Sequence, residues 1–491
     1  MPRERSNAFW QRANSSFWFL PALIVAGGIV LYAVTLTLDQ RTFTSLSALP
    51  IVFSGGASAA RSVLAAISGS LISVITTAFS LTIVAFVLAS GQYTPRLLRS
   101  LTADRGLQVV LGTYIATFVY SLLVLRIVRT AESESAAFIP VISVTTAVVL
   151  AILCVALLIY FIQHVMNLIQ PSTIVQRIQD ETLEPLAGLD DLDGPPEEED
   201  DQEENPNLKG LPAEAPLEIR AQQGGYVQYL DVDAIVEAVS AARDPEFIEI
   251  PFSPGHFVAA GLPVARIWPA REDTELDSGT EDKVRQAVVF GKERAFGQDF
   301  TFGLRQLTDI ALKGLSPSTN DPTTAMQAMD RTEAILVALG EKALPRRVQV
   351  RGTGKARLPV RIGYPNFGGI VELALDQVRR AAFATGQVVF LLRLLEVTDR
   401  ALRANALPER RKALWARAFD VGRLAPRQLP SERDAVALVL RAVEAGAPLL
   451  ETEQGTAVGS DLEELAGLSE GLRGGERVRE AVDAAWEDLG R

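Results

Sequence analysis

The second of four long apolar segments carries small hydroxyl residues at helical spacing. Gly69, Ser73, Thr76 or its neighbour Thr77, and Ser80 recur at intervals of four, three and four residues, which places them on one stripe of an α-helix. Hydroxyl oxygens on such a stripe could replace part of an ion's hydration shell in a pore. The same residues could instead serve close helix packing, because small side chains let backbones approach and hydroxyls bond to nearby carbonyls. Both interpretations stay open.

A second polar cluster lies far along the chain, where one expected helix ends and another begins. Its candidate ligand-binding residues are Arg305, Asp309, Ser316, Asn320 and Asp321. The acidic and amide side chains, with free N–H groups at a helix N-terminus, could bind a cation or a small ligand. The simpler alternative is a helix–turn–helix in which Asp321 caps the second helix and Pro322 takes its first position.

Several classes of chemistry find no support in the residues. The chain has one cysteine, Cys154, and two histidines far apart, His164 and His256, so a metal site built from these residue types is not expected. No Ser-His-Asp set, P-loop or dinucleotide-binding glycine motif occurs in a suitable context. The net charge of −12 argues against nucleic acid as a partner. We therefore expect no enzymatic activity and no cofactor.

The hydroxyl stripe must be positioned by an integral membrane domain of four transmembrane helices, expected over residues 1–179. Its apolar spans share a length of about 17–23 residues, which suffices to cross a hydrocarbon layer of about 30 Å. They are Phe17–Leu38, Ile67–Ala89, Val109–Leu125 and Val141–Ile162. The loop after the second span carries Arg96 and Arg99, which we expect to anchor the protein at the lipid headgroups or to contact acidic residues.

Positive charge near the span ends indicates the orientation. Six arginines flank the spans on the side of the N-terminus, and four lie on the opposite side. Because cytoplasmic loops carry the excess of Lys and Arg, both termini are expected in the cytoplasm.

The polar part of the chain is expected to be a cytoplasmic α+β region in three pieces. Residues 180–216 hold fourteen acidic residues and one lysine, which predicts a disordered acidic linker. Residues 217–270 show short strands bounded by Gly and Pro, and the turn at Pro254–Val264 is similar to that of a small barrel-sandwich module. Residues 281–491 are mainly helical, with a hairpin near 347–362.

Several motifs, in order along the chain, resemble one bacterial family. The motif R-Q-L-x-D-I-A occupies Arg305–Ala311, S-P-x-x-N-D-P occupies Ser316–Pro322, and Q-Y-T-P-R-L-L-R occupies Gln92–Arg99. Ser16–Ala22 and Gly112–Tyr120 resemble the first and third spans of the same family. It is a family of predicted membrane proteins catalogued as a domain of unknown function, and the resemblance covers most of residues 15–400. It implies a four-span membrane domain with a cytoplasmic domain and brings no established activity.

These observations lead to two functional hypotheses. The first is an oligomeric channel-like protein with a cytoplasmic regulatory domain; one stripe per chain cannot enclose a path, so a pore requires a homo-oligomer in the lipid bilayer. The alternative is a membrane-anchored sensor or scaffold that binds a small ligand, a cation or a protein through the Asp309/Asn320/Asp321 region.

Overall fold

The structure is a computed structural model of the 491-residue chain. It describes residues 18–41, 53, 55–92, 104–129, 138–189, 215–242, 245–269, 276–345, 348–351, 358–452 and 454–487. The chain divides into two compact units, Met1–Ile174 and Val175–Arg491, which we call the membrane unit and the soluble unit. The expected interfacial residues Arg96 and Arg99, and residues 190–214 of the expected linker, lie outside the described residues.

The membrane unit contains four helices long and apolar enough to cross a membrane, as predicted. They are α2 (Phe19–Arg41), α3 (Ala57–Gln92), α5 (Arg105–Ile127) and α6 (Val141–Leu168). Helix α5 contacts each of the other three. Of its most apolar 18-residue stretch 61% is buried, against 17–22% for the corresponding stretches of the other three helices. The central helix of this bundle is therefore α5.

Helix α3 begins ten residues before the predicted start at Ile67, at Ala57. The early part contains Arg61, a charge that ends the apolar run in the sequence. In the structure the Arg61 guanidinium donates a hydrogen bond of 3.1 Å to the carbonyl of Val128, just after α5. The charge therefore has a partner near the end of the bundle, and the helix continues through it.

The helix that runs from the end of the membrane unit into the soluble unit overturns the predicted boundary of the acidic linker. Helix α7 spans Pro171–Ala187, so the linker does not begin at residue 180. Thr182, inside the stretch assigned to the linker, is fully buried, and a Cβ added at Gly303 of α10 (Thr301–Leu315) would lie 1.6 Å from its Oγ1. The apolar face of Ile174, Ile178 and Leu186 packs into the structure, which the acidic composition around it obscured.

Two sheets follow, joined by one apolar core that also includes α8 (Val232–Ala242). The larger sheet has the order β1-β5-β3-β8-β7 and the smaller one β4-β2-β6. The strands are β1 (Leu217–Arg220), β2 (Gly225–Leu230), β3 (Pro245–Ile250), β4 (Phe257–Val258), β5 (Pro263–Pro269), β6 (Val288–Gly291), β7 (Val348–Arg351) and β8 (Leu358–Ile362).

This topology corrects the predicted module of residues 217–270. The module is not self-contained, because β6 completes the smaller sheet and β8 pairs in parallel with β3. The predicted hairpin near 347–362 forms as β7 and β8 and extends the larger sheet. Among the described residues neither sheet closes into a barrel, so the barrel-sandwich arrangement is not confirmed. Pairing between distant segments decided this arrangement, and local patterning does not encode it.

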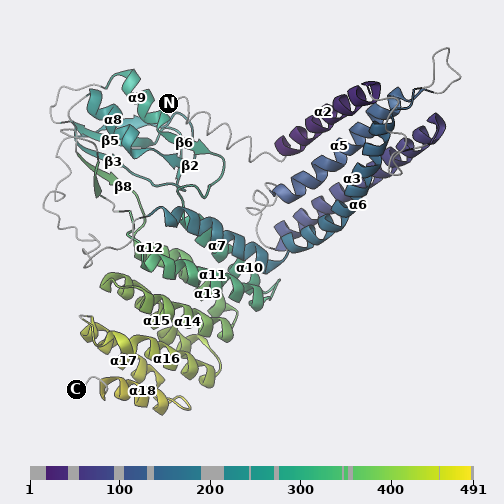
Figure 1. Ribbon diagram of the computed structural model, residues 1–491. Helices are drawn as coiled ribbons and strands as arrows, with labels where there is room; N and C mark the ends of the chain where they lie inside the picture. Colours follow the sequence, from purple (N-terminus) through teal and green to yellow (C-terminus); the bar gives the residue numbers. More distant parts are fainter. Residues whose placement is uncertain are drawn as a thin grey trace. The chain divides into compact units, whose positions relative to one another are not determined.

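The rest of the soluble unit is helical. After α9 (Ser278–Gln286) and α10 come α11 (Pro322–Gly340), α12 (Phe367–Val371), a π-helical turn (Glu372–Asp376), α13 (Gln377–Ala384), α14 (Val388–Ala404), α15 (Pro408–Gln428), α16 (Glu432–Gly446), a 3-10 turn (Ala447–Leu449), α17 (Gly455–Ser469) and α18 (Glu476–Glu487). Figure 1 shows α10 to α18 following one another as packed helices.

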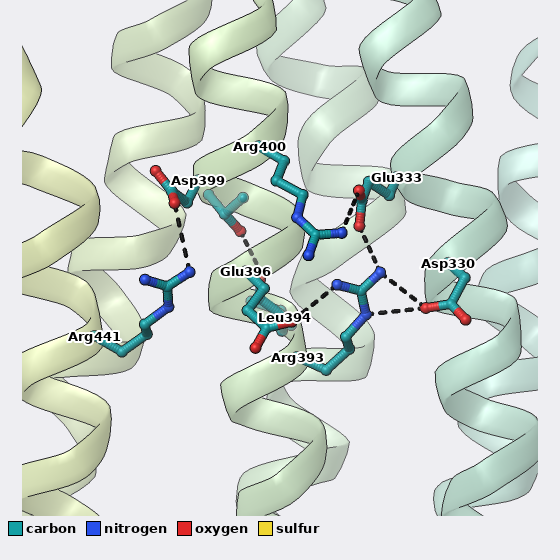
Figure 2. A network of polar contacts seen from close by, with 9 residues as sticks. Asp330, Glu333, Arg393, Leu394, Glu396, Asp399, Arg400 and Arg441 are labelled. Atoms are coloured by element: carbon teal, nitrogen blue, oxygen red, sulfur yellow. Dashed lines mark hydrogen bonds and ion pairs between the residues drawn. The ribbon is translucent and has the colours of Figure 1, made fainter.

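Both apolar packing and ion pairs connect these helices. Arg393 of α14 lies 2.9 Å from Asp330 and also pairs with Glu333, both on α11 (Figure 2). Arg400 reaches Glu333 at 3.1 Å, and Arg441 of α16 lies 3.5 Å from Asp399 of α14. Arg393 and Glu333 are only 17% and 15% exposed, so these charges are shielded from water by neighbouring helices and hold α11, α14 and α16 in register.

Candidate functional site

The hydroxyl stripe of α3 lies on the outer surface of the membrane unit. Gly69, Ser73, Thr76, Thr77 and Ser80 are all exposed. The opposite side of the same helix, marked by the seven-residue spacing of Leu71, Ala78 and Ala85, is buried against the bundle. A Cβ added at Gly69 would meet nothing within 4 Å. The stripe therefore does not pack against other described helices of its own chain.

Each hydroxyl of the stripe donates its hydrogen to its own helix. Thr76 bonds the carbonyl of Ile72 at 2.9 Å, Thr77 that of Ser73 at 3.0 Å, and Ser80 that of Thr76 at 2.8 Å. Ser73 bonds Gly69 at a longer 3.4 Å. Because the hydrogen is used internally, the oxygen lone pairs are the groups left to interact outside the helix. Chemically, such a face is suited to accept hydrogen bonds or to contact a cation.

The interior of the bundle holds a polar cluster that the sequence interpretation missed. Asp39, at the end of α2, accepts hydrogen bonds from Ile142 N (2.7 Å), Ser143 N (2.9 Å) and Ser143 Oγ (2.6 Å) at the start of α6. Tyr120 of α5 lies 2.9 Å from Thr35 Oγ1 and donates to the Ser143 carbonyl. The carboxylate caps a neighbouring helix, where free N–H groups and the helix dipole favour a negative charge. An aspartate directly after an apolar span was the available signal.

Another pair of this kind lies at the start of α5. Asp104 caps this helix by accepting from Leu107 N at 2.9 Å, and its Oδ1 lies 2.7 Å from Nε2 of His164 on α6. His164 also stacks on Tyr160, with ring centroids 5.2 Å apart. The pair links the start of α5 to the last turns of α6. We interpret it as a structural link between helices.

The predicted ligand site of the soluble unit consists of residues that already have internal partners. Asp321 caps α11 by accepting from Thr324 N at 3.0 Å and Thr324 Oγ1 at 2.6 Å. Asp309 forms an ion pair of 3.1 Å with Arg305, one turn away on α10. Asn320 has a left-handed backbone with φ of 46°, and its side-chain oxygen accepts from Gln387.

The remaining predicted residue, Ser316, donates to the carbonyl of Lys313 at the end of α10. The turn between α10 and α11 is therefore held by capping and local hydrogen bonds, as the simpler alternative expects. Its use as a ligand site stays a prediction. Across the described ranges no group of three His, Cys, Asp or Glu side chains is arranged to hold a metal ion.

Comparisons with known proteins also indicate a membrane protein. The profile of the family described as "Predicted membrane protein (DUF2254)" matches residues 14–400. Uncharacterized proteins of Mycobacterium bovis and Mycobacterium tuberculosis are each 33% identical over 452 residues, covering 91% of this chain and 82% of theirs. No solved structure matches the chain.

Proposed function

We propose a channel-like function for this chain, which belongs to the DUF2254 family of predicted membrane proteins. In this proposal the chain forms a homo-oligomer in the bacterial inner membrane. The α3 stripes of neighbouring subunits face one another and line a polar path. The soluble unit lies in the cytoplasm and regulates the path, and no catalytic step is assigned to it.

The observation that carries the proposal is the outward position of the stripe. Lipid is a poor partner for a row of glycine and hydroxyl residues, whereas the α3 helix of a second subunit could pack closely against it. The stripe lies opposite the face that α3 buries in its own bundle, so it is free to meet another copy without any change in the fold.

A path through one subunit has less support. The interior around α5 is filled by large side chains, and Tyr114, Tyr120 and Phe161 are at most 1% exposed. Protein interiors are packed at crystal-like density, which leaves no continuous space for an ion. A path between subunits is therefore the better proposal.

The stripe also favours one class of solute. Its hydroxyl hydrogens are donated to backbone carbonyls, so the oxygens present lone pairs to a passing species. Oxygen ligands without a fixed charge suit a weakly held, mobile cation. A small cation is the solute that we propose.

Cysteine cross-linking in native membranes tests the arrangement. In a Cys154→Ser background, Ser73→Cys or Thr76→Cys should form disulfide-linked dimers under mild oxidation, because equivalent stripes would lie together. Ile152→Cys on α6, where the native side chain is 66% exposed, is the matched control and should stay monomeric. Equal cross-linking at all three positions, or none at the stripe, would contradict the proposed oligomer.

Cation flux into proteoliposomes then tests transport. Ser73→Leu and Thr76→Leu should lower the flux about tenfold or more, because a large apolar side chain replaces an oxygen ligand in the path. Leu81→Ile, an exposed position beside the stripe, is the control and should conduct like the native chain. If the stripe cross-links as expected but the leucine variants leave the measured flux unchanged, the oligomer would be supported and the channel function contradicted.

A further inference from the structure

A pocket in the soluble unit is separate from the membrane stripe and from the predicted site at Asp309 and Asp321. Its volume is about 270 Å³. Three segments line it: the turn before β4, the loop before α10, and the stretch leading into α12 and the π-helical turn. Assuming about 30 Å³ for each water molecule, the volume corresponds to roughly nine waters. A ligand of only a few heavy atoms or one ring fits this space.

The polar wall of the pocket is built around a buried ion pair. Arg294 donates from Nε to Asp299 Oδ2 at 2.8 Å and from Nη2 to Oδ1 at 3.0 Å. Thr301 Oγ1 donates to Oδ1 at 2.7 Å and accepts from Arg294 Nη2 at 2.8 Å. The Asp299 side chain is 2% exposed and that of Arg294 is 21% exposed. Arg294 is thus fixed in direction while part of it still reaches the pocket.

The backbone of the facing turn is shaped to admit this pair. Gly255 has a φ of +90°, and a Cβ built there would lie 2.0 Å from Asp299 Oδ2. Only glycine satisfies both the left-handed conformation and the close approach. Burial raises the pKa of Asp299, while the Arg294 guanidinium and the Thr301 hydroxyl oppose this rise. The bidentate geometry favours the ionised pair.

The polar groups of this wall that remain available to a ligand are mainly hydrogen-bond donors. Both oxygens of Asp299 are occupied, and the hydrogen bonds of Arg294 within the described residues use Nε and Nη2, leaving Nη1. His256 Nδ1 lies 3.1 Å from the backbone nitrogen of Ser253, 3.0 Å from its Oγ and 3.2 Å from its carbonyl oxygen. In the tautomer in which Nδ1 accepts from the Ser253 N–H, Nε2 carries the ring proton. Nη1 can still donate to a second carboxylate, while Nη2 already donates to Asp299 and Thr301.

The apolar wall of the pocket is the part of its lining formed by Phe300, Ile370 and Leu373, with Pro254 and Pro365. Burial raises the pKa of Tyr364, which also lines the pocket, so its phenol stays uncharged at neutral pH. A ligand with an acceptor-rich end and a short apolar body matches the two walls.

We propose that this pocket binds a small monocarboxylate, with its carboxylate on Arg294 and His256 and its apolar body against Phe300, Ile370 and Leu373. The ligand is a short-chain or single-ring carboxylic acid in its ionised form. The proposal stands apart from the channel, because it rests on residues of the soluble unit alone.

Calorimetric titration of the full-length protein in detergent tests this binding, with acetate, butyrate and benzoate as probes at constant ionic strength. Butyrate or benzoate should saturate one site per chain, more tightly than acetate, because only these probes reach the apolar wall. Benzamide, which matches benzoate in shape and lacks the charge, should bind at least about tenfold more weakly. No saturation by any carboxylate up to about 10 mM, an affinity weaker than about 3 kcal/mol, would overturn the proposal.

Two variants locate the site without relying on a protein that fails to fold. Leu373→Trp fills the pocket from its apolar wall and should abolish binding with little change in melting temperature. His256→Gln, at an exposed position, should weaken benzoate binding several-fold and leave benzamide unchanged. Benzoate binding that survives Leu373→Trp, equal binding of benzamide, or equal competition by sulfate would each contradict a carboxylate site in this pocket.

Discussion

The two units differ in how far their polar side chains rely on ion pairs. In the membrane unit, hydroxyls such as those of Thr76 and Ser80 bond the carbonyls of their own helix, and Asp39 bonds the end of an adjacent helix. In the soluble unit, side chains such as Arg393 and Arg441 form ion pairs that link separate helices (Figure 2). A lipid environment supplies no water to a polar group, so hydroxyls there bond to nearby backbone carbonyls. Partial exposure to water lowers the cost of charge in the soluble unit.

The largest expected effect comes from removing the cap between α2 and α6. Asp39→Ala leaves two N–H groups and the Ser143 hydroxyl without their acceptor in a buried place, and should lower the free energy of unfolding by about 3 kcal/mol. Thermal unfolding in detergent measures the loss.

Asp39→Asn is the matched control for that prediction. It keeps one oxygen acceptor and should lose about half as much stability. Because this cap is buried, added salt should change the effect little. A melting temperature of Asp39→Ala equal to that of the native chain would show that the cap contributes nothing, and the contrast between the units would fail.

A pair of glycines in the soluble unit separates backbone strain from steric contact. Gly255 and Gly261 have φ values of +90° and +85°, but only at Gly255 would a Cβ meet a neighbour. Gly261→Ala should therefore cost about 1 kcal/mol for the backbone alone, and Gly255→Ala about 2 kcal/mol or more, since it also displaces Asp299.

Thermal unfolding of the two variants side by side gives the difference directly. The excess loss for Gly255→Ala measures how firmly the Arg294–Asp299 pair is held. Equal losses would mean that Asp299 moves aside freely, and the idea of a fixed guanidinium in the pocket would be weakened.

The smallest expected effect is at the turn between α10 and α11. Asp321→Ala removes the cap of α11 and should lower stability by about 1 kcal/mol. Asp321→Ser should restore most of it, because a serine hydroxyl caps a helix well.

The same two variants sharpen the rival interpretation of that turn. If the Asp309/Asn320/Asp321 region binds a cation, calorimetric titration of the native protein with Ca²⁺ or Mg²⁺ should show binding that both variants lose, whatever their stability. Stability that follows the cap, with no cation binding in the native chain, leaves only the structural role.

Much of the local structure was predictable because its signals are local. The four spans, the start of α11 at Pro322 after the Asp321 cap, and five strands of residues 217–269 follow from apolar length, capping residues and alternation. The errors have physical causes too. The second half of α7, from residue 180, was assigned to the linker because of its acidic residues.

The candidate sites divide in the same way. The spacing of Ser73, Thr76 and Ser80 is visible in the sequence because a helix repeats every 3.6 residues. Whether that stripe faces inward or outward depends on which side α3 buries against α5. The sequence contains no comparable signal for Arg294, Asp299 and His256, because their common pocket forms from three segments far apart along the chain.

The sequence by itself determined that this protein has four apolar helices, a polar domain rich in local caps and turns, and a row of hydroxyls on one helix. Hydrophobic length and residue periodicity specify these features without reference to distant residues. Only the tertiary structure decided that the hydroxyl row lies on the outside, that β8 joins β3, and that Asp39 caps α6. Each of these depends on contacts between distant segments, which packing selects among many arrangements that the same local patterns allow.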